Sequence, residues 1–101
     1  MTAVVSPRLL QALTDITGEI HLDSALRIVT QDAIAHRLES IATQLHTLEQ
    51  KYGMSFEQFD VRFQAEGLPN QYSYEVEQDY LEWEGLLCRQ RRLQEVRACL
   101  G

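Results

Sequence analysis

The sequence predicts a mainly α-helical protein, with a short N-terminal strand or extended arm, a short helix, one long helix and two further helices, forming a dimer. The 101 residues include only two Pro and five Gly, so long stretches run without a helix breaker. Large apolar residues recur at spacings of three and four, the period of one helical face. Signals that begin and end helices stand at the borders of these stretches. A chain of this length corresponds to a single domain, 1–101.

Composition and charge narrow the class of protein. Hydrophobic residues make up 45% of the chain, which excludes a disordered tail. No apolar run has the ~18–20 residues of a membrane span, and the N-terminus lacks the apolar core of a signal peptide, so we expect a cytoplasmic protein without membrane contact. The net charge of −6 argues against nucleic acid as the main ligand and favours neutral or basic partners.

The N-terminal section, 1–21, combines an arm with the short helix. Residues 2–6 are short and β-branched, which predicts the strand or extended arm. Ser6 as N-cap, Pro7 in the first turn and Gly18 as the stop signal predict the helix that follows. Its inward-facing residues are predicted to be Leu9, Leu10, Leu13 and Ile16.

The long helix is predicted over 22–53, with Asp23 or a neighbour as N-cap and Gly53 as its end. In its second half, six apolar residues are spaced alternately four and three apart, which indicates the seam of a coiled coil or an antiparallel helix pair. These residues are Ile34, Leu38, Ile41, Leu45, Leu48 and Tyr52. In the first half, a similar stripe is displaced by one position: Leu22, Leu26, Val29 and Ala33. The seam exceeds what one short neighbouring helix would cover, so we expect dimerisation.

The C-terminal section, 55–101, is predicted to be a helical pair. Ser55 and Gln58 fit a capping box, and Met54 with Phe59 fits a hydrophobic staple, so a helix begins at Phe56. The sequence at 66–70 ends it. The last helix runs from Ser73 or Tyr74 to Cys99, with an apolar seam at Val76, Tyr80, Trp83 and Leu87.

Six aromatic residues are predicted to form one cluster. An exposed groove for a partner and a core beneath the last three helices are both consistent with it, and the helical spacing favours the core. The cluster comprises Tyr52, Phe56, Phe59, Phe63, Tyr80 and Trp83. Tyr72 and Tyr74 stand where the last helix begins and are better candidates for surface contact.

The histidines and cysteines indicate no metal or cofactor site. His21, His36 and His46 are 15 and 10 residues apart, whereas two ligands on one helix need a spacing of three or four. Cys88 and Cys99 lie on one helical face, ~16 Å apart along the axis, so they cannot pair with each other. We expect both as reduced thiols.

No arrangement of residues typical of an enzyme is present. Ser55 is explained by its capping role. Glu82 and Glu84 point to different sides of a helix, whereas a working carboxylate pair must converge. We therefore expect a protein without catalytic residues.

The last helix is electrically polarised. Its start, 73–84, holds five acids and no basic residue, and its end holds Arg89, Arg91, Arg92 and Arg97 against Glu95. The helix macrodipole alone favours this order. Antiparallel pairing of two copies is a second interpretation, because each acidic half would face a basic half. In a third, a basic protein partner is held by Glu77, Tyr80 and Glu84, with Tyr72 and Tyr74 nearby.

Two blocks of the chain, KYGMSFEQF and DYLEWE, carry a resemblance over roughly 45–90. The matching positions are Glu49, Lys51, Tyr52, Gly53, Met54, Ser55, Phe56, Phe59, Asp79, Tyr80, Glu82, Trp83 and Glu84. The chain resembles a group of small all-helical prokaryotic proteins, mostly uncharacterised, some of which are regarded as antitoxin components of toxin–antitoxin modules. The resemblance implies an antitoxin-like interaction protein whose partner is a small basic toxin. The alternative is a structural homo-oligomer without a fixed hetero-partner.

The N-terminal third also resembles a ribbon-helix-helix antitoxin in the order of its elements, which would imply DNA binding. The ribbon would present Thr2, Val4 and Ser6, and none of these is a side chain that reads bases. This third function is therefore the least supported.

Overall fold

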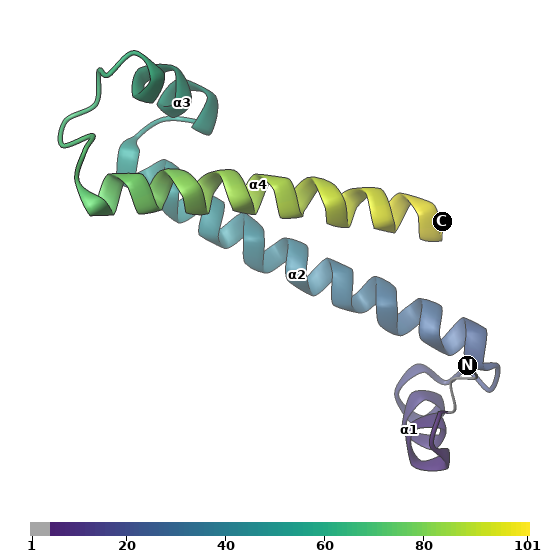
Figure 1. Cartoon of the computed structure of the whole chain (residues 1–101). Helices are drawn as coiled ribbons and strands as arrows, with labels where there is room; N and C mark the ends of the chain where they lie inside the picture. Colours follow the sequence, from purple (N-terminus) through teal and green to yellow (C-terminus); the bar gives the residue numbers. More distant parts are fainter. Residues whose placement is uncertain (1–4) are drawn as a thin grey trace.

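The computed structural model describes residues 5–101, and every regular element in this range is a helix. The helices are α1 (Pro7–Thr17), α2 (Leu22–Tyr52), α3 (Phe56–Gln64) and α4 (Tyr74–Leu100), as Figure 1 shows. The mainly α class is confirmed. Of the predicted strand or arm at 2–6, residues 2–4 lie outside the described residues. Val5 and Ser6 belong to no strand, and Ser6 instead caps α1.

Serine side chains begin three of the helices. The Ser6 hydroxyl accepts from the third amide of α1, and the Ser73 hydroxyl does the same for α4. Ser55 and Gln58 form the predicted capping box, in which each side chain accepts from the other residue's backbone N–H. Three of the four helix starts are thus set by residues within three positions of each other.

Glycines end the first two helices, as predicted. Gly18 and Gly53 adopt left-handed φ angles of 74° and 65°, which residues with a side chain rarely tolerate. The predicted N-cap of α2 differs. The helix begins at Leu22 with His21 at the cap position and no side-chain capping bond. Asp23 lies in the first turn, where its charge favours the helix dipole instead.

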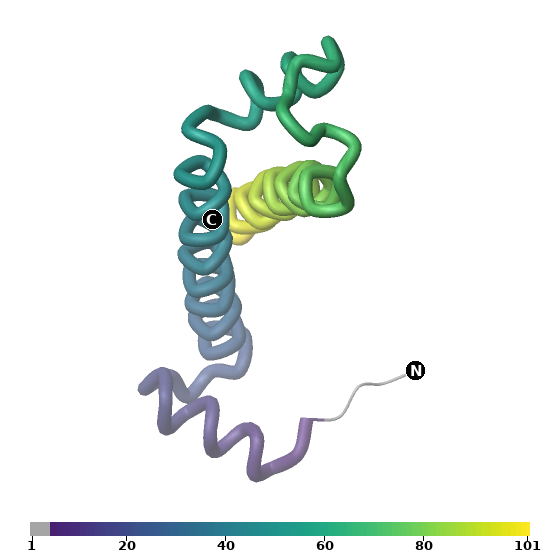
Figure 2. The backbone as a smooth tube through the Cα atoms, turned by 90° about the vertical axis from the view of Figure 1, so that its left-hand side faces the viewer, coloured from purple at the N-terminus to yellow at the C-terminus, as the bar shows by residue number. Residues whose placement is uncertain are grey.

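The helices α2 and α4 run antiparallel, and α3 lies across the end where they are joined (Figures 1 and 2). Helix α1 packs against the start of α2, at the opposite end of the molecule. The molecule measures 57 × 27 × 21 Å, with a radius of gyration of 19.6 Å. A compact chain of this length would have about 13 Å. No helix within residues 5–101 combines the length and apolar character needed to cross a membrane.

The predicted seam of α2 is confirmed, and α4 of the same chain covers it. Ile34, Ile41, Leu45 and Leu48 are buried, and Leu38 and Tyr52 are half-buried. On the α4 side the buried residues are Val76, Trp83 and Leu86. The premise that this seam needs a second copy was wrong, because the long α4 supplies its partner.

The predicted inward faces of the N-terminal third are largely wrong. In α1 only Leu13 is buried, whereas Leu9 is 52% and Ile16 72% exposed. In the first half of α2, Ala25 is buried, and Leu22 and Leu26 are exposed. Helix α1 is short and packs across the first turns of α2, so it covers only the residues at the crossing and leaves their neighbours in solvent.

Candidate functional site

The aromatic cluster joins the end of α2, the whole of α3 and the first half of α4. Phe59 and Trp83 are essentially fully buried, and their ring centroids lie 5.1 Å apart. Phe63 stacks on Tyr80 at 4.4 Å, and Tyr52 meets Phe59 edge-on at 4.6 Å. Such pairs add about 0.5–1.5 kcal/mol beyond their buried area. The prediction that these rings form one core cluster is confirmed, and the half-buried Phe56 also lines a surface groove between α3 and α4.

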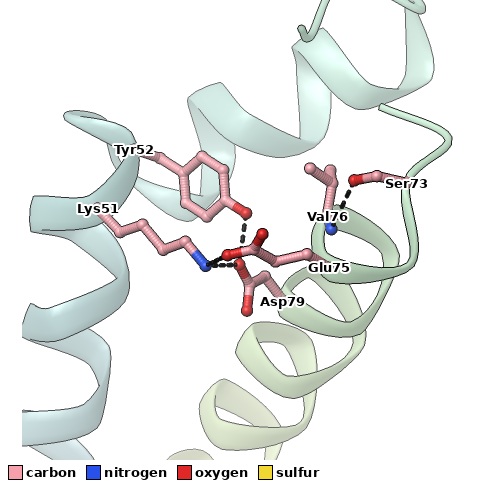
Figure 3. A network of polar contacts seen from close by, with 6 residues as sticks. All are labelled: Lys51, Tyr52, Ser73, Glu75, Val76 and Asp79. Atoms are coloured by element: carbon pink, nitrogen blue, oxygen red, sulfur yellow. Dashed lines mark hydrogen bonds and ion pairs between the residues drawn. The ribbon is translucent and has the colours of Figure 1, made fainter. Parts of the chain in front are cut away.

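A polar network closes this end of the molecule between α2 and α4 (Figure 3). The Lys51 Nζ donates to Glu75 Oε1 and Asp79 Oδ2, both at 2.6 Å, and the Tyr52 hydroxyl donates to Asp79 Oδ2 at 2.5 Å. Burial and the Asp79 carboxylate raise the pKa of Tyr52 to about 12. The bonds to Asp79 and then to Glu75 raise the pKa of Lys51. Asp79 is the shared acceptor that fastens the start of α4 to the end of α2.

Tyr80 makes the corresponding link between α4 and α3. Its hydroxyl donates to Asp60 Oδ1 at 2.7 Å and accepts from Gln64 Nε2 at 3.4 Å. The bond to Asp60, with a smaller contribution from burial, raises the pKa of Tyr80. The structure therefore places Tyr80, a predicted partner contact, half-buried against α3 and within the aromatic cluster.

Three other predicted contacts lie on an exposed flank of α4, beside its buried face. Tyr74, Glu77 and Glu84 are exposed, and Leu81, which is 60% exposed, stands between the two glutamates. The spacings of three, four and three place these four side chains on one face of the helix. We call this row the outer stripe. Within residues 5–101, none of its side chains forms an ion pair or hydrogen bond to another residue, so the acids and apolar groups face solvent.

Tyr72 lies in the loop before α4 and is set apart from the outer stripe. It is 72% exposed, and its hydroxyl donates to Glu66 Oε1 at 2.6 Å, which raises the pKa of Tyr72. At its other end the outer stripe meets a groove of about 270 Å³ between α3 and α4, lined by Glu84, Cys88 and Arg91 among others. The structure thus brings Tyr74, Glu77 and Glu84 together and separates Tyr72 and Tyr80 from them.

Leu81 is the residue of this surface that sequence reasoning missed. Its position four residues after Glu77 and three before Glu84 was the available signal. Counting charges does not identify Leu81 as a contact residue, because leucine is uncharged.

Metal-ligating and thiol groups stay dispersed. In the described part of the chain, no three His, Cys, Asp or Glu residues gather where they could hold a metal ion. Cys88 and Cys99 are both exposed and unpaired by disulfide.

Comparisons with protein-family models, with curated proteins and with solved structures gave no match.

Proposed function

We propose that this chain is a non-enzymatic helical interaction protein that binds a basic protein partner along the outer stripe. The observation that carries the proposal is the exposed row Tyr74, Glu77, Leu81 and Glu84 on a helix whose other face is fixed in the core. An aromatic and an aliphatic side chain supply contact area, and the two carboxylates favour a cationic surface. The net charge of −6 adds long-range attraction for the same class of partner.

The antitoxin-like role is the specific form of this proposal. The pattern KYGMSFEQF and DYLEWE, the small size and the acidity support it, and the partner would be a small basic toxin in the cytoplasm of a prokaryote. In the pattern, Lys51, Tyr52, Phe59, Asp79 and Trp83 have contacts that explain them structurally. Glu84 is exposed, belongs to no such contact within residues 5–101 and lies in the outer stripe, so it is the acid of the pattern that we assign to the partner.

The experiment is affinity capture of the tagged full chain from its host at native expression and low salt, with identification by mass spectrometry. We expect one small basic protein in a near-equal amount. The double variant Glu77→Lys, Glu84→Lys should lose that protein, because both rim charges become repulsive. The double variant Glu39→Lys, Glu82→Lys is the matched control, since both residues are exposed, lie outside the outer stripe and change the net charge by the same amount. An equal loss with the control would mean that total charge, and not this surface, drives capture.

Self-association of α4 is the second candidate function, and the charge pattern of its exposed residues favours it. Arg89, Arg91, Arg92 and Arg97 are exposed along the second half of α4, opposite in sign to the exposed acids of the first half. Antiparallel pairing would match these halves. Cross-linking of a cysteine placed at 77 should then reach the second half of α4 in another copy. A concentration-independent monomer in light scattering would remove this candidate.

A further inference from the structure

A cavity on the side of the α2–α4 pair has a character opposite to that of the chain as a whole. It has a volume of about 380 Å³, and its lining includes His36, Arg37, Ser40, Gln44 and Arg89. We call this the arginine groove. No carboxylate lines it, although acids outnumber Lys and Arg by 15 to 9 in the chain. Its size is within the ~300–1,000 Å³ range of small-molecule sites.

The arginines of the arginine groove have no ion-pair partner within residues 5–101. Ion pairs in this range involve Arg27, Lys51 and Arg92 as the cations. By helical position the nearest acids are Asp32 and Glu39, about one turn before and after His36, and Glu82, two turns before Arg89. None of these belongs to the lining. Arg37 and Arg89 are exposed and come from facing helices, so both guanidinium groups are free to converge on a ligand.

A comparison along α2 shows that this lack of carboxylates is local. Arg37, Gln44 and Lys51 are each seven residues apart and lie along one side of the helix. At the end of this row, Lys51 is held by two carboxylates of α4. At Arg37, the α4 residue in the lining is a second arginine. The same helix pair therefore neutralises its cation at one site and gathers cations at the other.

We propose that the arginine groove binds the phosphate group of a small phosphate ester or polyphosphate. A phosphate carries about −1.5 to −2 charges at pH 7 and three acceptor oxygens. Its charge therefore balances two arginines, whereas the single charge of a carboxylate does not. Guanidinium forks bind such oxygens in pairs, and the Ser40 hydroxyl and Gln44 amide add neutral donors. This inference is independent of the proposed function, because the arginine groove and the outer stripe lie on different sides of α4.

The test is a titration of the ¹⁵N-labelled full chain with sodium pyrophosphate at low salt, followed by NMR. Saturable shifts are expected at the amides of Arg37, Ser40 and Arg89. Arg37→Gln and Arg89→Gln should each weaken binding about tenfold or more, because each removes a charge-assisted hydrogen bond. Gln is a good helix former, and circular dichroism checks that the fold is kept. Arg91→Gln is the matched control on the other side of α4 and should change binding less than twofold.

Four results would overturn the proposal. Shifts that do not saturate, or an Arg91→Gln effect as large as that of the groove variants, would mean general attraction of anions. Citrate that binds as tightly as pyrophosphate would contradict phosphate recognition. A short single-stranded oligonucleotide that displaces pyrophosphate at much lower concentration would assign the arginine groove to nucleic acid instead.

Discussion

The two ends of α2 are packed in opposite ways. At its C-terminal end, α3 and α4 surround Tyr52 with aromatic rings, and hydroxyl and ammonium groups are bonded to Asp79 and Asp60. At its N-terminal end, α1 buries little beyond Leu13 and Ala25, and among residues 5–101 six large aliphatic side chains remain exposed there. These are Leu9, Leu10, Ile16, Ile20, Leu22 and Leu26.

This difference indicates that most of the free energy of folding comes from the C-terminal end of α2 and the helices packed against it. The C-terminal end of α2, with α3 and the first half of α4, forms the aromatic end of the molecule. It contains the two fully buried rings, Phe59 and Trp83, and a polar network in which Lys51 and Tyr52 are hydrogen-bonded. The N-terminal third contributes one short helix with a narrow contact. We infer that α3, α4 and the second half of α2 form the stable unit, and that α1 can open without unfolding the rest.

The largest effect is expected in the buried ring at the centre of the aromatic cluster. Phe59→Ala should lower the free energy of unfolding by about 3–5 kcal/mol, because the ring is fully buried and leaves a cavity. Ile16→Ala in α1, where the side chain is 72% exposed, should change it by no more than about 0.5 kcal/mol. Urea unfolding followed by circular dichroism measures both. Similar losses in the two variants would contradict the comparison.

A smaller effect is expected from the shared carboxylate of the polar network. Asp79→Ala removes the acceptor of both Lys51 and the Tyr52 hydroxyl, and should cost about 1.5–3 kcal/mol. Glu75→Ala removes only a carboxylate that is 72% exposed, and should cost less than about 1 kcal/mol. The urea midpoints of the two variants show which substitution lowers the free energy of unfolding more. A larger loss of stability in Glu75→Ala would mean that the exposed Lys51–Glu75 ion pair, and not the bonds to Asp79, supplies most of the stabilisation.

The raised pKa of Tyr52 predicts a stability loss in alkali. The folded protein holds this proton up to about pH 12, whereas an unfolded tyrosine releases it near 10, so the stabilisation is complete below about pH 10. It should then decline as the pH rises toward 12. The stability difference between the wild type and Tyr52→Phe should therefore be constant up to pH 10 and fall above it.

The smallest of these effects concerns the helix caps. Ser55→Ala breaks the capping box beside the aromatic cluster and should lower global stability by about 1 kcal/mol. Ser6→Ala removes an equivalent cap from α1 and should leave the global midpoint nearly unchanged, since α1 opens before the rest. Thermal unfolding of the two variants provides the comparison. Equal shifts would show that α1 unfolds together with the core.

Local sequence signals predicted the helices well, because the responsible residues are neighbours in the chain. Ser55 and Gln58 are three residues apart, and Gly53 acts on the turn just before it. The Tyr52–Asp79 bond joins residues 27 positions apart, and no local pattern indicates it.

The residues of the candidate surfaces also fall into those that local sequence predicts and those that depend on packing between distant helices. The exposure of Tyr74, Glu77 and Glu84 follows from helical spacing against a known apolar seam. Tyr80 differs because the angle at which α3 crosses α4 decides whether its hydroxyl meets solvent or Asp60. The orientation of α1 is likewise set by packing and not by its own pattern, which is why the apolar residues Leu9 and Ile16 were assigned to the inside.

Native-state hydrogen exchange of the full chain, resolved by residue, tests most directly whether α1 is less stable than the aromatic end. We expect amides of α3, of the first half of α4 and of the facing part of α2 to exchange only through global unfolding. Amides of α1 should exchange through a local opening at least about a hundredfold more frequent, which corresponds to about 2.7 kcal/mol. Protection in α1 equal to that around Phe59 would contradict the account, because the N-terminal third would then share the stability of the aromatic end.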